Sequence, residues 1–177
     1  SGRQYGPDHA GSGRRGMKRV ITLWALLGAA YVALETLWRG YSHPSMFIVG
    51  GLCGVLVGAL NQAPRFYNAP VALQAAAGAA VVLAVEFASG CILNLWLGLD
   101  VWDYSGLPGN VLGQICPAFG LLWFLLMPFA IWAEDTARWC IWFYEMSLMP
   151  PGEPDVKTPL PALYSLKSIY YDFIKGK

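Results

Sequence analysis

Four long apolar runs dominate the chain, and short polar segments separate them. The runs cover approximately residues 20–38, 44–60, 71–97 and 111–133. A helix that crosses the hydrocarbon core of a bilayer needs about 20 consecutive apolar residues. The first run meets this length, the second is short, and the third is long enough to tilt. This pattern predicts an all-α membrane protein whose four transmembrane helices form two helical hairpins.

The segment before the first run has a different composition. Residues 1–16 are basic and rich in glycine, and no helical or strand period runs through them. We interpret them as a cloning remnant or a disordered arm, because MKRVITLW from Met17 has the composition of a natural start. A cleaved signal peptide that begins at Met17 is the alternative, and the continuation of the apolar run through Leu34 argues against it. The transmembrane domain is therefore expected over residues 17–133.

The segment after the fourth run, residues 134–177, is expected to lie in the cytoplasm. EDTARWCIWFYE predicts a charged turn followed by an interfacial helix, because amphipathic aromatic rings favour the boundary between water and lipid. Four such rings lie close together in it: Trp139, Trp142, Phe143 and Tyr144. PPGEPDVKTPLP is a proline-rich linker. The tail, LYSLKSIYYDFIKGK, has apolar residues at helical spacing and is either a surface helix or disordered.

The overall composition supports a location in the cell membrane. The 177 residues are 56% hydrophobic and 13% charged, whereas soluble globular chains carry about 25% charged residues. The eight Trp and nine Tyr suit a protein that places many rings at a lipid boundary. A net charge of +1 offers no electrostatic argument for binding nucleic acid.

The distribution of Lys and Arg predicts the orientation in the membrane. Basic residues are enriched in the cytoplasmic loops of membrane proteins. The termini and the second loop carry these basic residues: Arg14, Arg15, Lys18, Arg19, Arg65, Arg138 and Lys157. The first and third loops contain only Arg39. A multi-pass protein with both termini in the cytoplasm is therefore expected.

Glycines in the second run and the cysteines suggest packing rather than metal chemistry. Gly50, Gly54 and Gly58 have the spacing that lets helix backbones approach closely, although glycine is also common in membrane helices without this role. The four cysteines have neither CxxC spacing nor a histidine within four residues: Cys53, Cys91, Cys116 and Cys140. Free thiols are expected, and the sequence predicts no metal site and no cofactor.

Two carboxylates fall inside the apolar runs. Glu35 follows Val20 by 15 residues (35 − 20), and Glu86 follows Val71 by 15 residues (86 − 71). At about 1.5 Å per residue both lie ~22 Å along their helices, which predicts a matching depth in the outer half of the membrane. A charge at the bilayer centre costs about 2.5–3.5 kcal/mol, so such residues usually face a protein interior or a wet cavity.

Each of these carboxylates has a structural and a functional interpretation. Arg39 lies four residues after Glu35, which is the helical spacing for an ion pair. Alternatively, Arg39 binds an anion or pairs with Glu86. Glu86 is either a neutral acid that hydrogen-bonds across helices or a proton-coupling group, because burial favours the neutral form of a carboxyl group.

The stretch VWDYSGLPGNVLGQICP, residues 101–117, connects the third and fourth runs. Asp103 precedes Tyr-Ser-Gly and predicts an Asx-type turn. Asn110 is placed to cap a helix that begins at Val111, and His43 is interpreted as a loop histidine. The candidate substrate or ion site therefore comprises Glu35, Arg39, Glu86, Asp103, Tyr104 and Asn110.

Part of this stretch is similar to an earlier segment. YSHPSMFIVGGLC and YSGLPGNVLGQIC align without gaps, with matching pairs Tyr41/Tyr104, Ser42/Ser105, Gly50/Gly113 and Cys53/Cys116. Parallel repeats of this kind occur in transporter folds, often with the functional site at the repeat interface. The match predicts a parallel repeat of two hairpins, and coincidence between common residues is the alternative.

The segment around the third loop resembles a known family. LAVEFASG followed by NLWLGLDVWDYSGLPGNVLGQICPAFGLLW is similar to small bacterial membrane proteins of the type IV, CmpB-like group of ABC-transporter permeases. Their W-D-Y-S…N…G-x-I-C…W pattern is matched by Trp102, Asp103, Tyr104, Ser105, Asn110, Gly113, Ile115, Cys116 and Trp123. Their first-span E-x-x-x-R element is matched by Glu35 and Arg39. The resemblance implies a multi-span fold and a permease role, and it implies no particular substrate.

Taken together, these patterns predict a transport or channel component with a polar site near the outer leaflet. No Gly-x-x-x-x-Gly-Lys-[Ser/Thr] loop is present, so an ATPase would be a separate subunit. Four spans form a small bundle, so a homo-oligomer or a partner membrane subunit is expected. A non-transporting scaffold or accessory subunit is the alternative. A membrane enzyme acting on lipid-linked substrates is least favoured, because no nucleophile–base pair is visible, and we expect the protein not to be an enzyme.

Overall fold

In the computed structural model, residues 9–63, 66 and 68–148 are described, and they form four α-helices and one π-helix. The elements are α1 (His9–Arg39), α2 (Pro44–Asn61), α4 (Val71–Gly90), η1 (Cys91–Trp96) and α5 (Pro117–Ser147). The predicted all-helical class is confirmed. The proline-rich linker and the tail lie outside the described residues.

Three helices in the described part of the chain are long and apolar enough to cross a membrane. They cover Gly16–Arg39, Val71–Trp96 and Pro117–Glu145, whereas the apolar stretch Pro44–Leu60 of α2 is shorter. Their outward faces carry large exposed apolar side chains, as a lipid-facing surface requires. The protein is therefore a membrane protein.

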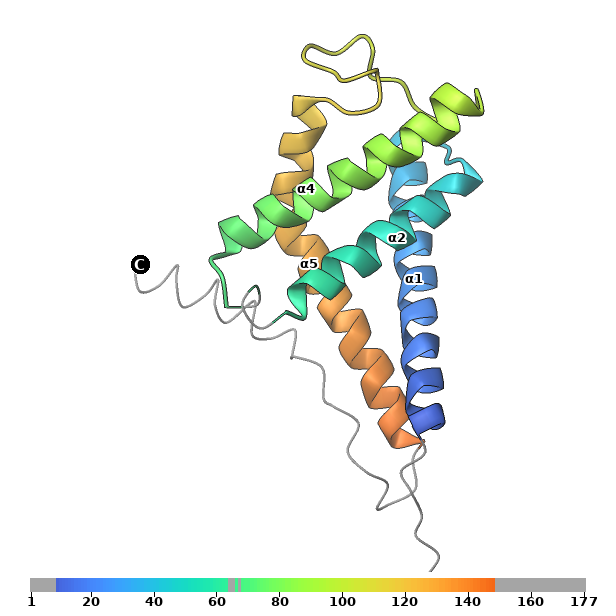
Figure 1. The fold of residues 1–177 in the computed structure, drawn as a ribbon, viewed down its shortest axis with the longest axis vertical. Helices are drawn as coiled ribbons and strands as arrows, with labels where there is room; N and C mark the ends of the chain where they lie inside the picture. The colour runs from blue at the N-terminus through green and yellow to red at the C-terminus, as the bar shows by residue number, and fades with distance from the viewer. Residues whose placement is uncertain (1–8, 64–65, 67, 149–177) are drawn as a thin grey trace, which may run out of the picture.

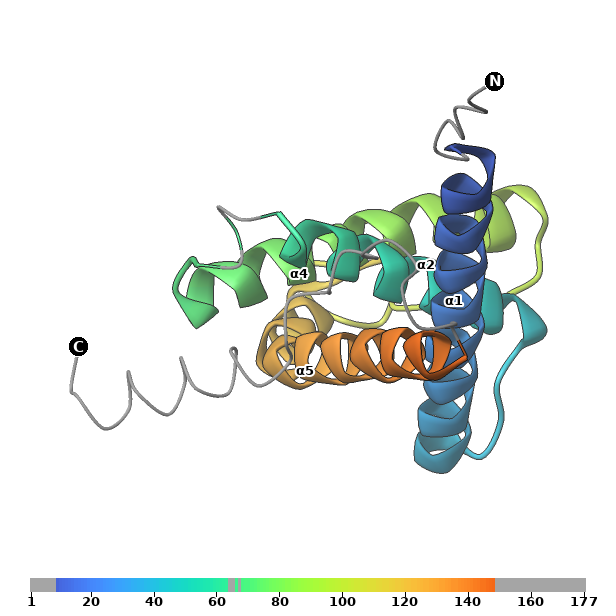
Figure 2. The ribbon, with the colours of Figure 1, turned by 90° about the horizontal axis from the view of Figure 1, so that it is seen from below.

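The helices cross rather than run parallel (Figure 1). The most extensive contacts join α1 to α2 and α4 to α5, while α2 also touches α4 and α5. In Figure 1 α2 and α4 run obliquely across α1 and α5, and Figure 2 shows the same crossing from below. An ion pair between Arg19 and Glu145 joins the N-terminal part of α1 to the last turns of α5. This arrangement places α2 between the other three α-helices.

Glycines bring α1 and α2 into close contact. A Cβ added to Gly50 would lie 2.6 Å from the Cβ of Tyr31, and one added to Gly54 would lie 2.5 Å from Cδ1 of Leu27. Gly51 faces the backbone oxygen of Trp24 in the same way. The two backbones are therefore closer than any larger residue at these positions would allow.

A buried apolar layer joins α2, α4 and α5. It consists of Val57, Ala75, Val82, Met127 and Ile131, with Cys53, Val81, Trp123 and Phe124 packed against it. Met127 and Ile131 are four residues apart on α5, so they lie on the same face of that helix.

α5 differs most from the sequence prediction. It begins at Pro117 rather than Val111, because residues 104–115 form turns instead of a helical start. It then continues through residues 134–138, where a charged turn was predicted, to Ser147. The prediction was wrong because an i,i+4 ion pair between Glu134 and Arg138 lets these residues remain helical inside the protein. The predicted interfacial segment is thus the end of α5, with Trp139 and Phe143 stacked 5.4 Å apart.

Two further expectations are not matched. α1 begins at His9 instead of after a disordered arm, which is consistent with the low cost of extending a helix that is already nucleated. The two segments of the predicted repeat also differ in structure. Gly50 lies within α2, whereas Gly113 lies in a turn with φ +69°. The shared residues therefore occupy different backbone conformations, and the local structure does not support the repeat.

The contact between α1 and α2 can be tested with Gly50→Leu. Because Cβ of Tyr31 cannot move away without shifting the helix, we expect a destabilisation of about 1–3 kcal/mol. Gly16→Leu is a matched control on α1, since an added Cβ there meets nothing within 4 Å. Thermal unfolding in detergent micelles should show a lower Tm for Gly50→Leu alone, and equal losses in both variants would contradict the close contact.

Candidate functional site

Glu86 is the most deeply placed acid of the predicted site. It lies on the buried face of α4, at the helical spacing set by Ala75, Ala79 and Val82, and is 4% exposed. Its Oε2 is buried and has no hydrogen-bond partner in the described residues. The carboxyl group therefore faces the protein interior rather than lipid, as expected for an acid in a membrane helix.

Side chains from three other helices and a loop surround Glu86. Tyr31 of α1, Cys53 of α2 and Tyr104 of the loop interact with it electrostatically, and Trp123 of α5 lies beside it. The rings of Tyr31 and Trp123 are stacked, with centroids 6.2 Å apart. The Nε1–H of Trp123 is buried without a hydrogen-bond partner in the described residues, like Oε2 of Glu86. We call these five residues the Glu86 cluster.

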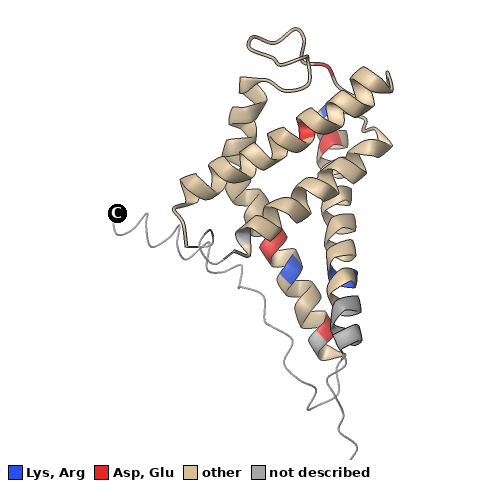
Figure 3. Ribbon diagram, in the orientation of Figure 1, with Lys and Arg blue, Asp and Glu red and all other residues tan. Residues whose placement is uncertain are grey.

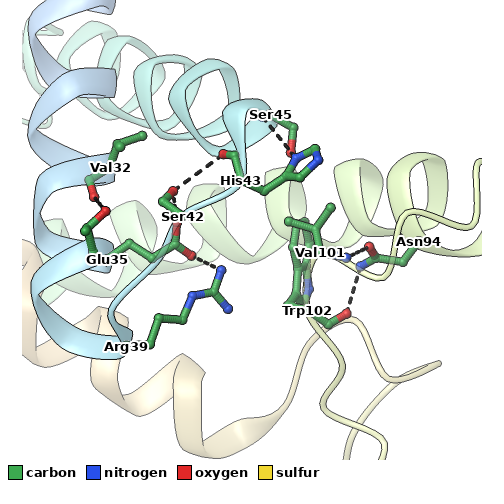
Figure 4. A network of polar contacts seen from close by, with 10 residues as sticks. Val32, Glu35, Arg39, Ser42, His43, Ser45, Asn94, Val101 and Trp102 are labelled. Carbon is green, nitrogen blue, oxygen red and sulfur yellow. Dashed lines mark hydrogen bonds and ion pairs between the residues drawn. The ribbon is translucent and has the colours of Figure 1, made fainter.

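Glu35 has partners of its own at the end of α1 (Figure 4). Arg39 forms an ion pair with one carboxylate oxygen, and the hydroxyl of Ser42 donates a hydrogen bond to the other. The guanidinium of Arg39 also lies 4.8 Å from the centre of the Tyr41 ring, within the range of a cation–π contact. Arg39 thus pairs with Glu35, not with Glu86.

Tyr31 and Tyr104 connect the two acids. Both tyrosines interact electrostatically with Glu35 and with Glu86. Figure 3 shows acidic positions of α1 and α4 at the same level of the bundle. Burial raises the pKa of Tyr104 well above its ordinary value, and the charge of Glu86 raises it further. Tyr104 therefore stays protonated and keeps an O–H group that can donate a hydrogen bond.

The π-helix η1 fixes the loop that carries Tyr104. Asn94, which is buried, donates hydrogen bonds to the backbone oxygen of Trp102 at 2.9 Å and to Oε1 of Gln114 at 2.8 Å. Its Oδ1 accepts one from the backbone N–H of Val101 at 2.8 Å. A single amide side chain thus joins η1 to both halves of the loop. Figure 4 shows its bonds to Val101 and Trp102. π-helical turns are often found at functional sites.

Gln114 and Trp102 add further hydrogen bonds to those of Asn94, and we call these three residues the loop clamp. Nε2 of Gln114 donates to the backbone oxygen of Leu112 at 2.9 Å, and Nε1 of Trp102 donates to the backbone oxygen of Gln114 at 3.1 Å. Gly90 provides the space for the Gln114 side chain, because an added Cβ there would collide with it. The sequence prediction missed Asn94 and Gln114. The available signal was the position of these two amides, near the end of the apolar run at 71–97 and near the start of the run at 111–133.

Asp103 and Asn110 organise the loop itself. Oδ1 of Asp103 accepts the backbone N–H of Ser105 at 2.8 Å, and its other oxygen accepts the Ser105 hydroxyl at 2.8 Å, forming the expected Asx-type turn. These hydrogen bonds lower the pKa of Asp103. Asn110 does not cap a helix; it donates to Leu107 at 2.8 Å and accepts from Gly113 at 3.0 Å. Neither side chain is among the residues found around Glu86.

A second group of buried acids was missed altogether. Glu134 and Asp135 of α5 are each 1% exposed, and Glu134 pairs with Arg138. The available signal was the segment EDTAR, residues 134–138, which has apolar residues before and after it. This segment places an acid and an arginine at helical ion-pair spacing.

His43 and the cysteines have local roles. Nδ1 of His43 accepts the backbone N–H of Ser45 at 3.2 Å and so caps the start of α2. The four cysteines are free thiols. Within residues 9–63, 66 and 68–148, no group of three or more His, Cys, Asp or Glu is placed to hold a metal ion.

Residues 22–143 match the family described as "Putative ABC-transporter type IV", so the chain belongs to this family. The match runs from α1 to α5 and includes the Glu86 cluster, the clamped loop and the acids of α5. The resemblance seen in the sequence is thereby confirmed. No curated protein and no solved structure matches the chain.

The clamp can be tested with Asn94→Ala. The substitution leaves the N–H of Val101 and the amide of Gln114 with unmet hydrogen bonds, each costing about 1–3 kcal/mol when buried. We expect amide hydrogen exchange in residues 98–116 to become at least tenfold faster. Leu95→Ala, at an exposed neighbouring position, is the control, and unchanged exchange in Asn94→Ala would exclude the clamp.

Proposed function

We propose that this chain is a membrane component of a transport system in which Glu86 is the proton-responsive group. The observation that carries the proposal is a buried carboxyl oxygen without a hydrogen-bond partner in the described residues, enclosed by side chains of α1, α2, α5 and the loop. Acids placed inside membrane bundles commonly belong to proton relays or ion pathways, because an idle charge there is costly.

The surroundings of Glu86 suit a group that changes its protonation state. The apolar environment favours the neutral acid, while a hydrogen bond from the indole N–H of Trp123, which lies beside Glu86, would favour the carboxylate. A small movement of this side chain relative to Glu86 alters that balance. The same cluster can therefore hold a proton in one arrangement and release it in another.

Orientation and partners follow from the charges at the ends of the helices. We infer four crossings with both termini in the cytoplasm, because Lys18 and Arg19 lie at the N-terminal end of the first span and the loop at 97–116 has no Lys or Arg. This orientation places the Glu86 cluster towards the outer face. The description of the family supports a transport role, and a separate ATPase or a second copy of the chain would complete the machinery.

A second candidate function is a membrane scaffold or accessory subunit without transport. The observation in its favour is that most of the predicted site is bonded within the chain. Glu35 is paired with Arg39 and Ser42, while Asp103 and Asn110 hold turns of the loop. A structural network of this kind needs no ligand.

Proton movement in proteoliposomes separates the two functions. The protein is reconstituted with a pH-sensitive dye inside, and a potassium diffusion potential drives proton entry. We expect wild-type protein to acidify the lumen and Glu86→Gln to lower the rate at least tenfold, because an amide cannot exchange a proton. Glu145→Gln, an acid of the same helix bundle outside the cluster, should retain the wild-type rate.

Thermal unfolding of the same preparations supplies the contrasting result. A transport role predicts that Glu86→Gln keeps a Tm near that of wild type, because the amide fits the same space. If wild type moves no protons and Glu86→Gln changes only the Tm, the transport proposal fails and the scaffold function is supported.

A further inference from the structure

α5 carries a second buried polar centre, formed by Glu134 and Asp135. Both residues are 1% exposed although they lie within the apolar stretch Pro117–Glu145. In Figure 3 the acidic positions on α5 lie below the acidic positions of α1 and α4. Two acids buried side by side in a membrane helix need a specific compensation.

The carboxyl group of Glu134 occupies a space provided by α2. It packs directly against Gly58, where any Cβ would collide with it. Arg138 pairs with Oε1, whereas Oε2 is buried and receives no hydrogen bond from a donor in the described residues. One oxygen is therefore neutralised and the other is left to accept a proton.

Asp135 provides the group that shares such a proton. Asp135 is buried next to Glu134 in the chain, and its carboxyl group interacts electrostatically with that of Glu134. An ionised carboxylate only accepts hydrogen bonds, so two carboxyl groups can bond to each other only when one is protonated. In the described part of the chain, the charged groups that interact electrostatically with Glu134 are Arg138 and Asp135, and both belong to α5. From α2, Gly58 lies against the carboxyl group of Glu134.

An apolar layer separates this pair from the Glu86 cluster. Trp123, which lies beside Glu86, and Glu134 are 11 residues apart on α5 (134 − 123), or roughly 16 Å along the helix. Met127 and Ile131 lie between them on the same face and belong to the buried apolar layer with Val57 and Val82. Direct proton exchange between the two acids is therefore blocked in this arrangement.

We propose that Glu134 and Asp135 form a second proton-binding site, separate from Glu86, in which the two carboxyl groups share one proton. With Arg138 the protonated site has no net charge. On release, the O–H bond breaks, the proton passes to water, and the site, with Arg138 still charged, is left with one negative charge. The site does not depend on the transport function proposed above, because binding of a proton requires no flux.

Infrared difference spectroscopy of the full chain in lipid nanodiscs tests this site. A step from low to high pH should remove the C=O stretching band of a protonated carboxylic acid. We expect Glu134→Gln and Asp135→Asn each to lose the band of this site, while Glu145→Gln keeps it and Glu86→Gln loses only the separate band of Glu86. A dye-based titration should likewise count one fewer proton released per chain in the first two variants.

Asp135→Asn keeps the Glu134–Arg138 ion pair, so it tests the shared proton even where Glu134→Gln fails to fold. A purely structural ion pair predicts that Glu134→Gln and Asp135→Asn have the same carboxylic-acid bands and the same proton counts as wild type. That result, or a band that persists in Asp135→Asn, would overturn the proposal. Loss of the band in Glu86→Gln as well would show that the two acids titrate as one site, which also contradicts it.

Discussion

The close approach of α1 and α2 is the contact on which the rest of the structure depends. Membrane helices gain no hydrophobic drive from packing together, so dispersion between backbones must hold them. Gly50 and Gly54 make that approach available against Tyr31 and Leu27. Because α2 then lies between the other α-helices, its Cys53 reaches the Glu86 cluster and its Gly58 admits the carboxyl group of Glu134. The glycines of α2 thus help to position both Glu86 and Glu134.

The loop at residues 97–116 is held in a different way, because polar side chains form hydrogen bonds with its backbone. An irregular segment beside a membrane must bond its own N–H and C=O groups, since lipid offers no substitute for water. Asn94 does this for the loop from η1, while Gln114, Asp103 and Asn110 do it from within the loop. These hydrogen bonds hold the loop in a fixed conformation that keeps Tyr104 close to Glu86.

The sequence predicts the helices well because apolar runs of this length have few alternatives in a membrane. The Glu35–Arg39 pair and the turn at Asp103 were also predictable, since each depends only on residues close in the chain. The burial of Glu134 within α5 was not, because the space for its carboxyl group comes from Gly58, 76 residues earlier (134 − 58), although its ion pair with Arg138 is local. The role of Asn110 depends likewise on backbone turns that its own residue type leaves open.

The presence of three buried acids, Glu86, Glu134 and Asp135, in so small a bundle is itself informative. Replacing buried ion pairs by apolar residues of similar volume is often neutral or stabilising, so packing alone gives no reason to keep them. Here each acid occupies a face that is otherwise apolar, Glu86 beyond Val82 on α4 and Glu134 beyond Ile131 on α5. An apolar layer with Pro128 beside it on α5 lies between them. A proline there frees a backbone carbonyl and favours bending, so the barrier between the two acids is also the part of α5 best able to change shape.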